Sequence, residues 1–84
     1  MKMILVIHEK DHEDNETDII GVAESIERAQ IMIDTYYGEY EELEFKDLRD
    51  YDDFQWSKRL RVGAPSDTKY EVTVTLEWFC INYL

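Results

Sequence analysis

Apolar and polar residues alternate along this chain with two different periods, and each period predicts a kind of element. Residues 3–7 form a short continuous apolar run, and residues 17–22 are rich in β-branched side chains. Both patterns are typical of strands. The polar residues between them indicate a long acidic loop, so the first quarter of the chain is expected to form a hairpin.

A helical period follows over residues 24–37. Ser25 suits the N-cap position, and Gly38 suits the position just after the last turn. Apolar side chains between them recur at spacings of three and four, which is typical of a helix with one buried side. They are Ile26, Ala29, Ile33 and either Tyr36 or Tyr37.

A two-residue period returns in the last third. Even-numbered positions are apolar over residues 54–62, apart from Lys58, and again over residues 70–80. The turn-forming residues 63–67 lie between the two runs, which predicts a second hairpin. Placing Val62 opposite Thr68 sets Leu60 against Tyr70, Trp56 against Val74 and Arg59 against Glu71.

Residues 39–53 show no clear period. Eight carboxylates in fifteen residues disfavour a sheet position, so this segment is expected to be irregular with helical turns. The chain is therefore predicted to be one small acidic α+β domain over residues 1–84. Its antiparallel sheet has about four strands, one main helix covers one face, and the element order is β-β-α-(irregular or short helix)-β-β.

The charge narrows the function classes. Twenty Asp and Glu against nine Lys and Arg give a net charge of −11, which disfavours direct binding of nucleic acid or of an anionic membrane. The single cysteine, Cys80, excludes an internal disulfide and is expected to be buried and inert in its strand. The apolar run at residues 3–7 is too short for a signal peptide. A cytoplasmic protein is expected.

Sequence motifs for chemistry are weak. His8, His12 and Cys80 lack a recognised metal-ligand spacing, and residues 11–16 lack the glycine and the glutamate of a calcium loop. No glycine-rich phosphate loop or nucleophile elbow occurs. We expect no enzyme, no cofactor and no metal.

The negative charge is concentrated in two segments. Residues 9–18 carry a net charge of −5 and residues 39–53 carry −6, so the rest of the chain is neutral. These segments either keep the protein soluble or imitate the phosphates of a nucleic acid toward a basic protein surface. On the second interpretation the partner-binding residues are Asp11, Glu13, Asp14, Glu16, Glu39, Glu41, Glu42, Glu44, Asp47, Asp50, Asp52 and Asp53, with Tyr40 and Tyr51 as aromatic anchors.

An alternative hypothesis concerns residues 78–84, where both sides of the strand become apolar. Such a strand end is either buried on both sides or forms an interface. This alternative describes a small structural or adaptor module that self-associates, with a homodimer as one form.

Residues 6–8 and 18–25, followed by Glu27, Ala29 and Ile33, resemble small uncharacterised proteins of bacteriophages and prophages. The shared pattern is a hairpin that ends in an Ile-Gly-Val strand, followed by a helix that opens on Ser-x-Glu-x-Ala, and it covers residues 4–37. The resemblance implies a phage origin and no catalytic residues. It also implies that the chain binds and disables a host factor. Together with the acidic segments, this makes a host nucleic-acid-handling or defence protein the expected partner, which the chain inhibits in the host cytoplasm.

Overall fold

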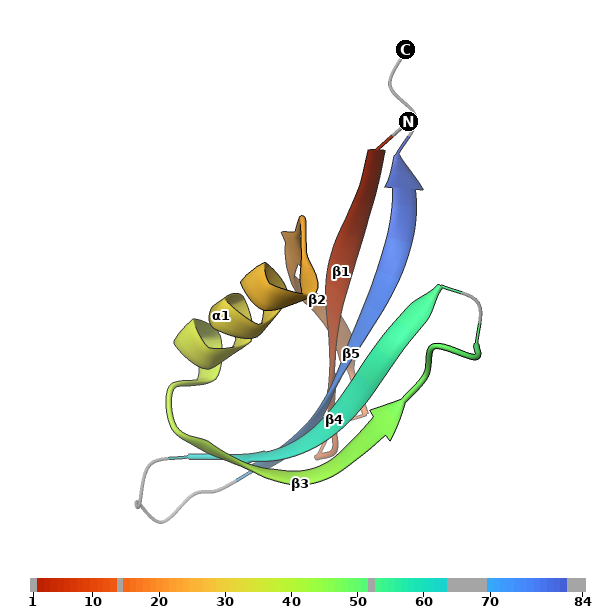
Figure 1. Cartoon of the computed structure of the whole chain (residues 1–84). Helices are drawn as coiled ribbons and strands as arrows, with labels where there is room; N and C mark the ends of the chain where they lie inside the picture. Colours follow the sequence, from red (N-terminus) through yellow and green to blue (C-terminus); the bar gives the residue numbers. More distant parts are fainter. Residues whose placement is uncertain (1, 14, 52, 64–69, 82–84) are drawn as a thin grey trace.

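A single antiparallel sheet with one helix on one face makes up the protein (Figure 1). The computed structural model describes residues 2–13, 15–51, 53–63 and 70–81. Its elements in chain order are β1 (Lys2–Asp11), β2 (Thr17–Ala23), α1 (Ile26–Tyr37), β3 (Tyr40–Asp47), β4 (Phe54–Val62) and β5 (Tyr70–Ile81). The predicted α+β class is confirmed, with five strands in place of about four.

The strand order in the sheet is β2-β1-β5-β4-β3. β1 and β2 form the predicted first hairpin, and β3, β4 and β5 follow one another as antiparallel neighbours. β5 then pairs with β1 in the centre of the sheet. Helix α1 carries the chain from the β2 edge to the β3 edge, so β2 and β3 are the two outer strands (Figure 1).

Both ends of α1 are fixed as the sequence predicted. The Ser25 Oγ accepts a hydrogen bond from the Arg28 N–H at 3.1 Å, which satisfies one of the free amides of the first turn. Gly38 has φ of 71°, a conformation that favours glycine, and its N–H bonds to the Asp34 carbonyl at 2.9 Å. Of the predicted apolar stripe, Ala29 and Ile33 are buried against the sheet.

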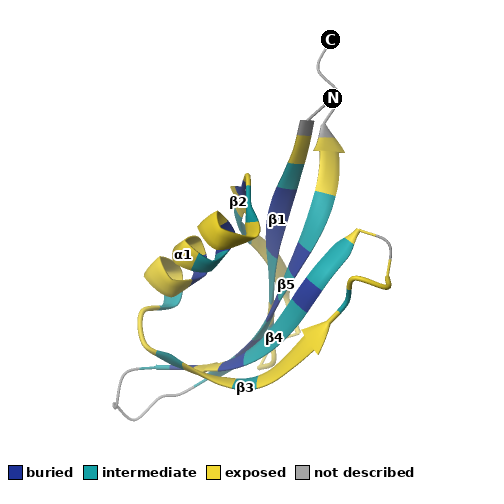
Figure 2. Ribbon diagram, in the orientation of Figure 1, coloured by how far each residue is buried: buried dark blue, intermediate teal, exposed yellow. Residues whose placement is uncertain are grey.

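The core lies between α1 and the sheet face that it covers (Figure 2). Even-numbered apolar residues of β4 and β5 supply most of it, as their two-residue period predicts. Odd-numbered Leu5 and Ile7 contribute from β1. The buried residues of this core are Leu5, Ile7, Ala23, Ala29, Ile33, Trp56, Leu60, Val62, Val72, Val74 and Leu76.

Residues 39–53 differ from the prediction, because residues 40–47 form strand β3. The carboxylates of β3 are tolerated because it is an outer strand whose only neighbour, β4, is basic. Glu41 lies opposite Arg61, and Glu42 reaches Lys58 at 3.2 Å. Opposite charges across a ladder stabilise the pairing, so the acidic composition concealed a strand.

The predicted register of the second hairpin is wrong by two residues. Val62 lies opposite Tyr70 and Leu60 opposite Val72, while residues 64–67 of the predicted turn, and Thr68, lie outside the described residues. A slip of two residues keeps every side chain on its own face, so the hydrophobic pattern cannot distinguish the two registers. Arg59 still reaches Glu71 diagonally, at 3.3 Å.

The paired ends of β1 and β5 project beyond the rest of the sheet (Figure 1). Met3 and Phe79 there are 45% and 44% exposed. Cys80 lies opposite Met3 and is also exposed, so the prediction of a buried thiol is wrong. The reason is that no other described element covers this part of the two strands.

Candidate protein-binding surfaces

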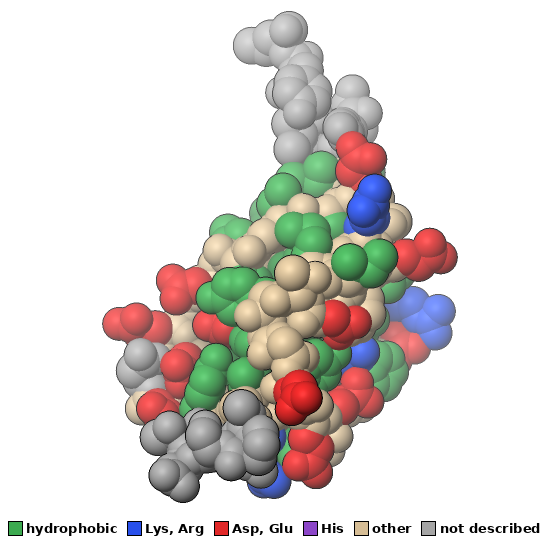
Figure 3. Space-filling model, turned by 90° about the vertical axis from the view of Figure 1, so that its left-hand side faces the viewer, with side chains coloured by type: hydrophobic (Ala, Val, Ile, Leu, Met, Phe, Trp, Pro, Cys, Tyr) green, Lys and Arg blue, Asp and Glu red, His purple; other side chains and the backbone are tan. Residues whose placement is uncertain are grey.

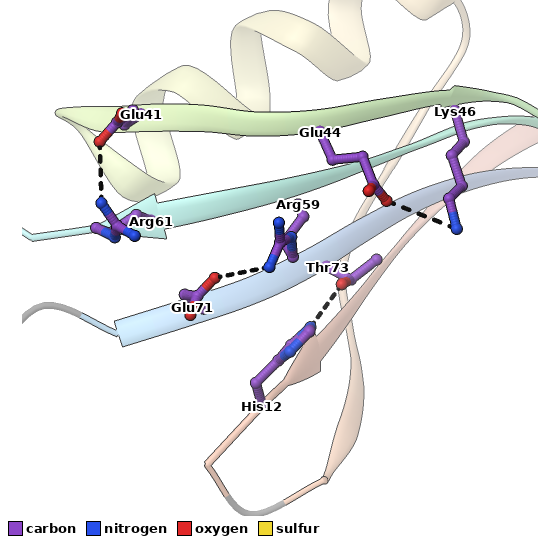
Figure 4. A network of polar contacts seen from close by, with 8 residues as sticks. All are labelled: His12, Glu41, Glu44, Lys46, Arg59, Arg61, Glu71 and Thr73. Carbon is purple, nitrogen blue, oxygen red and sulfur yellow. Dashed lines mark hydrogen bonds and ion pairs between the residues drawn. The ribbon is translucent and has the colours of Figure 1, made fainter.

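The sheet face that points away from α1 carries a balanced set of charges. Glu41 pairs with Arg61 at 3.4 Å, and Glu71 pairs with Arg59 at 3.3 Å (Figure 4). The Glu44–Lys46 pair, at 3.6 Å, belongs to the same face. Among the residues whose side chains the structure describes, this face holds by register four carboxylates and four cations, which are Glu41, Glu44, Glu71 and Glu77 with Lys10, Lys46, Arg59 and Arg61. The net charge of −11 therefore belongs to the remainder of the molecule.

One group of the predicted partner-binding carboxylates lies at the end of the β1–β2 hairpin. Asp11 ends β1, is half-buried, and accepts a hydrogen bond from the Glu13 N–H at 2.8 Å. Glu13 and Glu16 are exposed. Asp14 lies outside the described residues. The turn thus holds Asp11 in a local hydrogen bond and presents Glu13 and Glu16 to solvent.

A second group follows β3 along the opposite edge of the sheet. Glu39 precedes this strand and is exposed, as are four carboxylates within it. Each of those four, Glu41, Glu42, Glu44 and Asp47, already has a cation of this chain within ion-pair distance. Hydrogen bonds from the Arg49 side chain and backbone lower the pKa of Asp47 to about 2. A partner's cations would therefore share these carboxylates with cations of this chain.

The third group lies in the β3–β4 loop. Asp50 and Asp53 are exposed, and Tyr51 is 65% exposed, so it is placed as an anchor would be. The Tyr51 N–H bonds to the Leu48 carbonyl at 2.9 Å and holds the loop in a turn. Asp52 lies outside the described residues. Within the described ranges, Asp50 and Asp53 form no ion pair.

The hairpin and β3 do not form one continuous acidic row. The strand order places β1, β5 and β4 between β2 and β3, so the two acidic segments occupy opposite edges. Figure 3, which views the molecule from the α1 side, shows carboxylates toward both margins with hydrophobic side chains between them. A basic partner would contact these segments as two separate acidic areas.

Tyr40, the other predicted anchor, is already engaged within the protein. Its hydroxyl donates to the Asp34 Oδ1 at 2.5 Å and accepts from the Gln30 Nε2 at 3.0 Å. Burial, followed by the hydrogen bond to Asp34, raises the pKa of Tyr40 to about 12. Tyr40 therefore holds β3 to α1 and offers little of its ring to a partner.

Lys58, the one interruption of the apolar pattern in β4, also contacts Gln30. Together with Gln30, Glu42 and Trp56 it forms what we call the Lys58 cluster. Its Nζ lies 2.9 Å from the Gln30 Oε1, 3.2 Å from Glu42 and 4.5 Å from the centre of the Trp56 ring. Its side chain is only 17% exposed. Sequence reasoning missed this partly buried cation, although a lysine at an apolar position of a regular strand is the signal that could have revealed it.

The histidines have protein partners. The His8 Nε2 lies 3.0 Å from the Glu77 Oε1. The His12 Nε2 lies 2.6 Å from the Thr73 Oγ1, a contact drawn in Figure 4. Within the described residues no group of three or more His, Cys, Asp or Glu side chains has an arrangement that could hold a metal ion. His8 and Glu77 line a shallow hollow of about 300 Å³ together with Phe54.

An apolar groove between α1 and β2 was not predicted. A hollow of about 300 Å³ lies beside a second one of about 370 Å³, and both are lined by Ile31 and Met32. Ile20 and Tyr36 complete the first hollow, and Val22 belongs to the second. Ile31 and Met32 lie outside the helical stripe that faces the core, which is the signal that the sequence held for this groove.

No family model, no curated protein and no solved structure matches this chain. Among the described residues, no helix has the length and apolar character needed to span a membrane.

Proposed function

We propose that this protein is a non-enzymatic binding protein whose acidic edges occupy the basic surface of a partner, in the place that a nucleic acid would take. The partner class is a nucleic-acid-handling or defence protein, which the chain inhibits. The resemblance of residues 4–37 to phage proteins supports a host factor as the partner.

The observation that carries this proposal is the segregation of charge. On the sheet face opposite α1, the described side chains of four carboxylates and four cations balance, so the excess negative charge lies elsewhere, at the edges and loops. There, exposed carboxylates such as Glu13, Asp18, Glu39 and Asp50 form no ion pair with another described residue. The negative charge of these carboxylates attracts basic proteins, which raises their rate of association, and repels acidic proteins.

The carboxylates along β3 are spaced more widely than the phosphates of duplex DNA. Their spacing therefore indicates a surface that complements a basic groove, and not one that reproduces the phosphate rows of a duplex. Carboxylates occupy positions 39, 41, 42, 44 and 47 along β3 and the residue before it. At about 3.3 Å per residue this is one charge per roughly 6 Å. Duplex DNA carries about one per 1.7 Å of axis. The acidic edges therefore suit a partner whose Lys and Arg side chains are separate points of contact.

A charge-reversal variant tests the proposal. The variant changes four exposed carboxylates that form no ion pair with another described residue, which are Glu13, Asp18, Glu39 and Asp50. Changing them to Lys leaves intact the contacts of Lys58 and the ion pairs on the sheet face that points away from α1, which we call the open face. Affinity capture from a bacterial lysate, repeated at about 50 and 500 mM salt, is the measurement. We expect the parent to retain a basic protein at low salt only, and the variant to lose it at both.

The matched control exchanges the charges of one open-face pair. The double variant Glu71→Arg with Arg59→Glu keeps the net charge and reverses the ion pair that these two residues form at 3.3 Å. It is expected to capture the same protein as the parent. If the fourfold variant captures that protein equally well, or if the retention is insensitive to salt, the acidic edges do not form the binding surface.

A second candidate function, self-association, is favoured by the projecting ends of β1 and β5. Met3, Phe79 and Cys80 are exposed there on strands that no other described element covers. Exposed apolar groups on paired strands are typical of an interface. Sedimentation equilibrium, which measures the molecular mass in solution, compares the parent with the Phe79→Ser variant. A parent that stays monomeric at high concentration excludes this function.

A further inference from the structure

The two outer strands of the sheet differ in their protection against another strand. β3 carries exposed Glu41, Glu42, Glu44, Lys46 and Asp47. Charges of this kind help to prevent a further strand from pairing with an edge, whereas each outer strand has one register irregularity, after Glu42 in β3 and at Ile20 in β2, so the charges alone distinguish the two edges. β2 has Asp18 as its one charged residue, and Ile19 and Val22 are 64% and 51% exposed. The β2 edge is therefore open to pairing.

Helix α1 adds an apolar wall beside this edge. Ile31, Met32 and Tyr36 are 55%, 37% and 59% exposed and line the groove between α1 and β2. The hydrophobic side chains in the middle of Figure 3 lie on this side of the molecule. Gly21 keeps the groove narrow, because a Cβ at this position would approach the Met32 Cε to 2.8 Å.

Carboxylates outnumber cations at the two ends of this edge. Asp18 lies near the start of β2, whereas Glu24 follows its end and lines the second hollow with Arg28, and Glu27 lies in the first turn of α1. Between them, the residues of β2 from Ile19 to Ala23 carry no charge. The edge is thus complementary to a short apolar strand with a basic residue at each end. A second copy of the chain, with its own net charge of −11, is the less suitable occupant.

We propose that the β2 edge binds an extended segment of a partner protein, apolar over about five residues and flanked by Lys or Arg, which pairs with β2 as a sixth strand and places its side chains in the α1–β2 groove. The basic character of this segment rests on the function proposed above. Main-chain hydrogen bonds to β2 supply general affinity, and the groove selects the apolar side chains.

A defined peptide tests this directly. The probe is the nonapeptide KKVTVIVKK, acetylated and amidated, with its dissociation constant measured by fluorescence anisotropy at low salt. Three control peptides accompany it. One is EEVTVIVEE, and the other two are KKVTVIVKK with N-methyl groups on alternate central amides, one peptide for each of the two possible sets of amides. We expect the basic peptide to bind, the acidic one not to bind, and one of the two N-methylated registers to lose binding because its strand pairing is blocked.

Variants of the protein locate the site. Ile31→Ser is expected to raise the dissociation constant about tenfold, the loss of one well-packed apolar contact. Ile26→Ser is the matched control, because Ile26 is also exposed on α1, at 40%, but does not line the groove. It is expected to leave the dissociation constant within about twofold. Circular dichroism confirms that both variants keep the fold.

Four results would overturn the proposal. Equal affinity of Ile31→Ser and the parent removes the groove from the site, and equal affinity of the acidic peptide removes the charge complementarity. Undiminished binding by both N-methylated registers excludes strand pairing. A dimer of the parent that Ile31→Ser dissociates assigns the edge to a second copy. If the peptide binds but the lysate experiment captures no protein in a salt-sensitive way, the function proposed for the acidic edges is rejected and the β2 site is kept. If a protein is captured but the peptide does not bind, the β2 site alone is rejected.

Discussion

Two tyrosine hydroxyls near α1 depend on carboxylates for their hydrogen bonds. The Tyr37 hydroxyl donates to Glu9 on β1, and the Tyr40 hydroxyl donates to Asp34. Burial, and then these acceptors, raise the pKa of both tyrosines. Each hydroxyl can stay bonded to its carboxylate only while it keeps its proton, since two anions at this distance repel.

This arrangement predicts a loss of stability in alkali. The pKa of Tyr40 rises from 10.0 to about 12 on folding, so the unfolded chain loses this proton first. The free energy of unfolding should be fully retained below pH 10 and fall as the pH rises toward 12. Urea unfolding at successive pH values measures it. Tyr40→Phe should flatten the slope relative to Tyr51→Phe, whose side chain is exposed. Identical slopes would contradict the assignment.

At the scale of elements, Lys58 joins three of them. From β4 it contacts Gln30 of α1 and Glu42 of β3, and it lies over the Trp56 ring. A partly buried cation with several partners contributes more than an exposed ion pair does. Helix α1 and outer strand β3 thus depend on one side chain for part of their attachment.

Lys58→Ala and Lys46→Ala form a matched pair. Both lysines pair with a glutamate of β3, but their side chains are 17% and 64% exposed. Lys58→Ala should lower the free energy of unfolding by about 1–2 kcal/mol, because Gln30 and Glu42 lose a partner. Lys46→Ala should cost about 0.5 kcal/mol or less. Chemical denaturation measures both, and equal losses would show that the Lys58 contacts contribute nothing beyond a surface pair.

The elements that sequence reasoning predicted are those with local signals. Ser25 and Gly38 delimit α1, and the two-residue period identifies β4 and β5. β3 lacked such a signal, because its carboxylates become compatible with a strand only through the cations of β4. That pairing joins residues such as Glu41 and Arg61, twenty positions apart, and a single sequence does not reveal it.

The candidate site shows the same division between local and long-range signals. Exposure of Glu13, Glu39 and Tyr51 follows from their polar surroundings in the sequence and was predicted. The separation of the acidic segments onto opposite edges follows from the strand order, which no local pattern determines. The α1–β2 groove likewise needs Ile31 of the helix and Val22 of the strand brought together by the fold.

Over the whole molecule, the excess negative charge opposes folding. The balanced sheet face contributes no net charge, so the carboxylates of the edges and loops repel one another in the compact state. Salt screens this repulsion within about 10 Å at 0.1 M.

Salt should therefore stabilise the protein. Raising the salt from 10 to 500 mM is expected to increase the free energy of unfolding by about 1 kcal/mol, or roughly 4–8 °C in melting temperature for a domain of this size. Neutralising Glu39 and Asp50 with Gln and Asn should raise the melting temperature at low salt and reduce its response to salt. Differential scanning calorimetry measures both. A melting temperature independent of salt would show that the charges lie too far apart to interact.

The central pairing of β1 with β5 also sets the order of events in folding. Leu5 lies opposite Trp78, so the middle of the sheet closes a loop that contains nearly every other element. During synthesis, the β1–β2 hairpin and α1 emerge from the ribosome long before their principal neighbour exists. Until β5 is available, Leu5 and Ile7 have no strand on that side to pack against. Contacts so distant in the chain slow folding, so this domain is expected to fold more slowly than a helical domain of the same length.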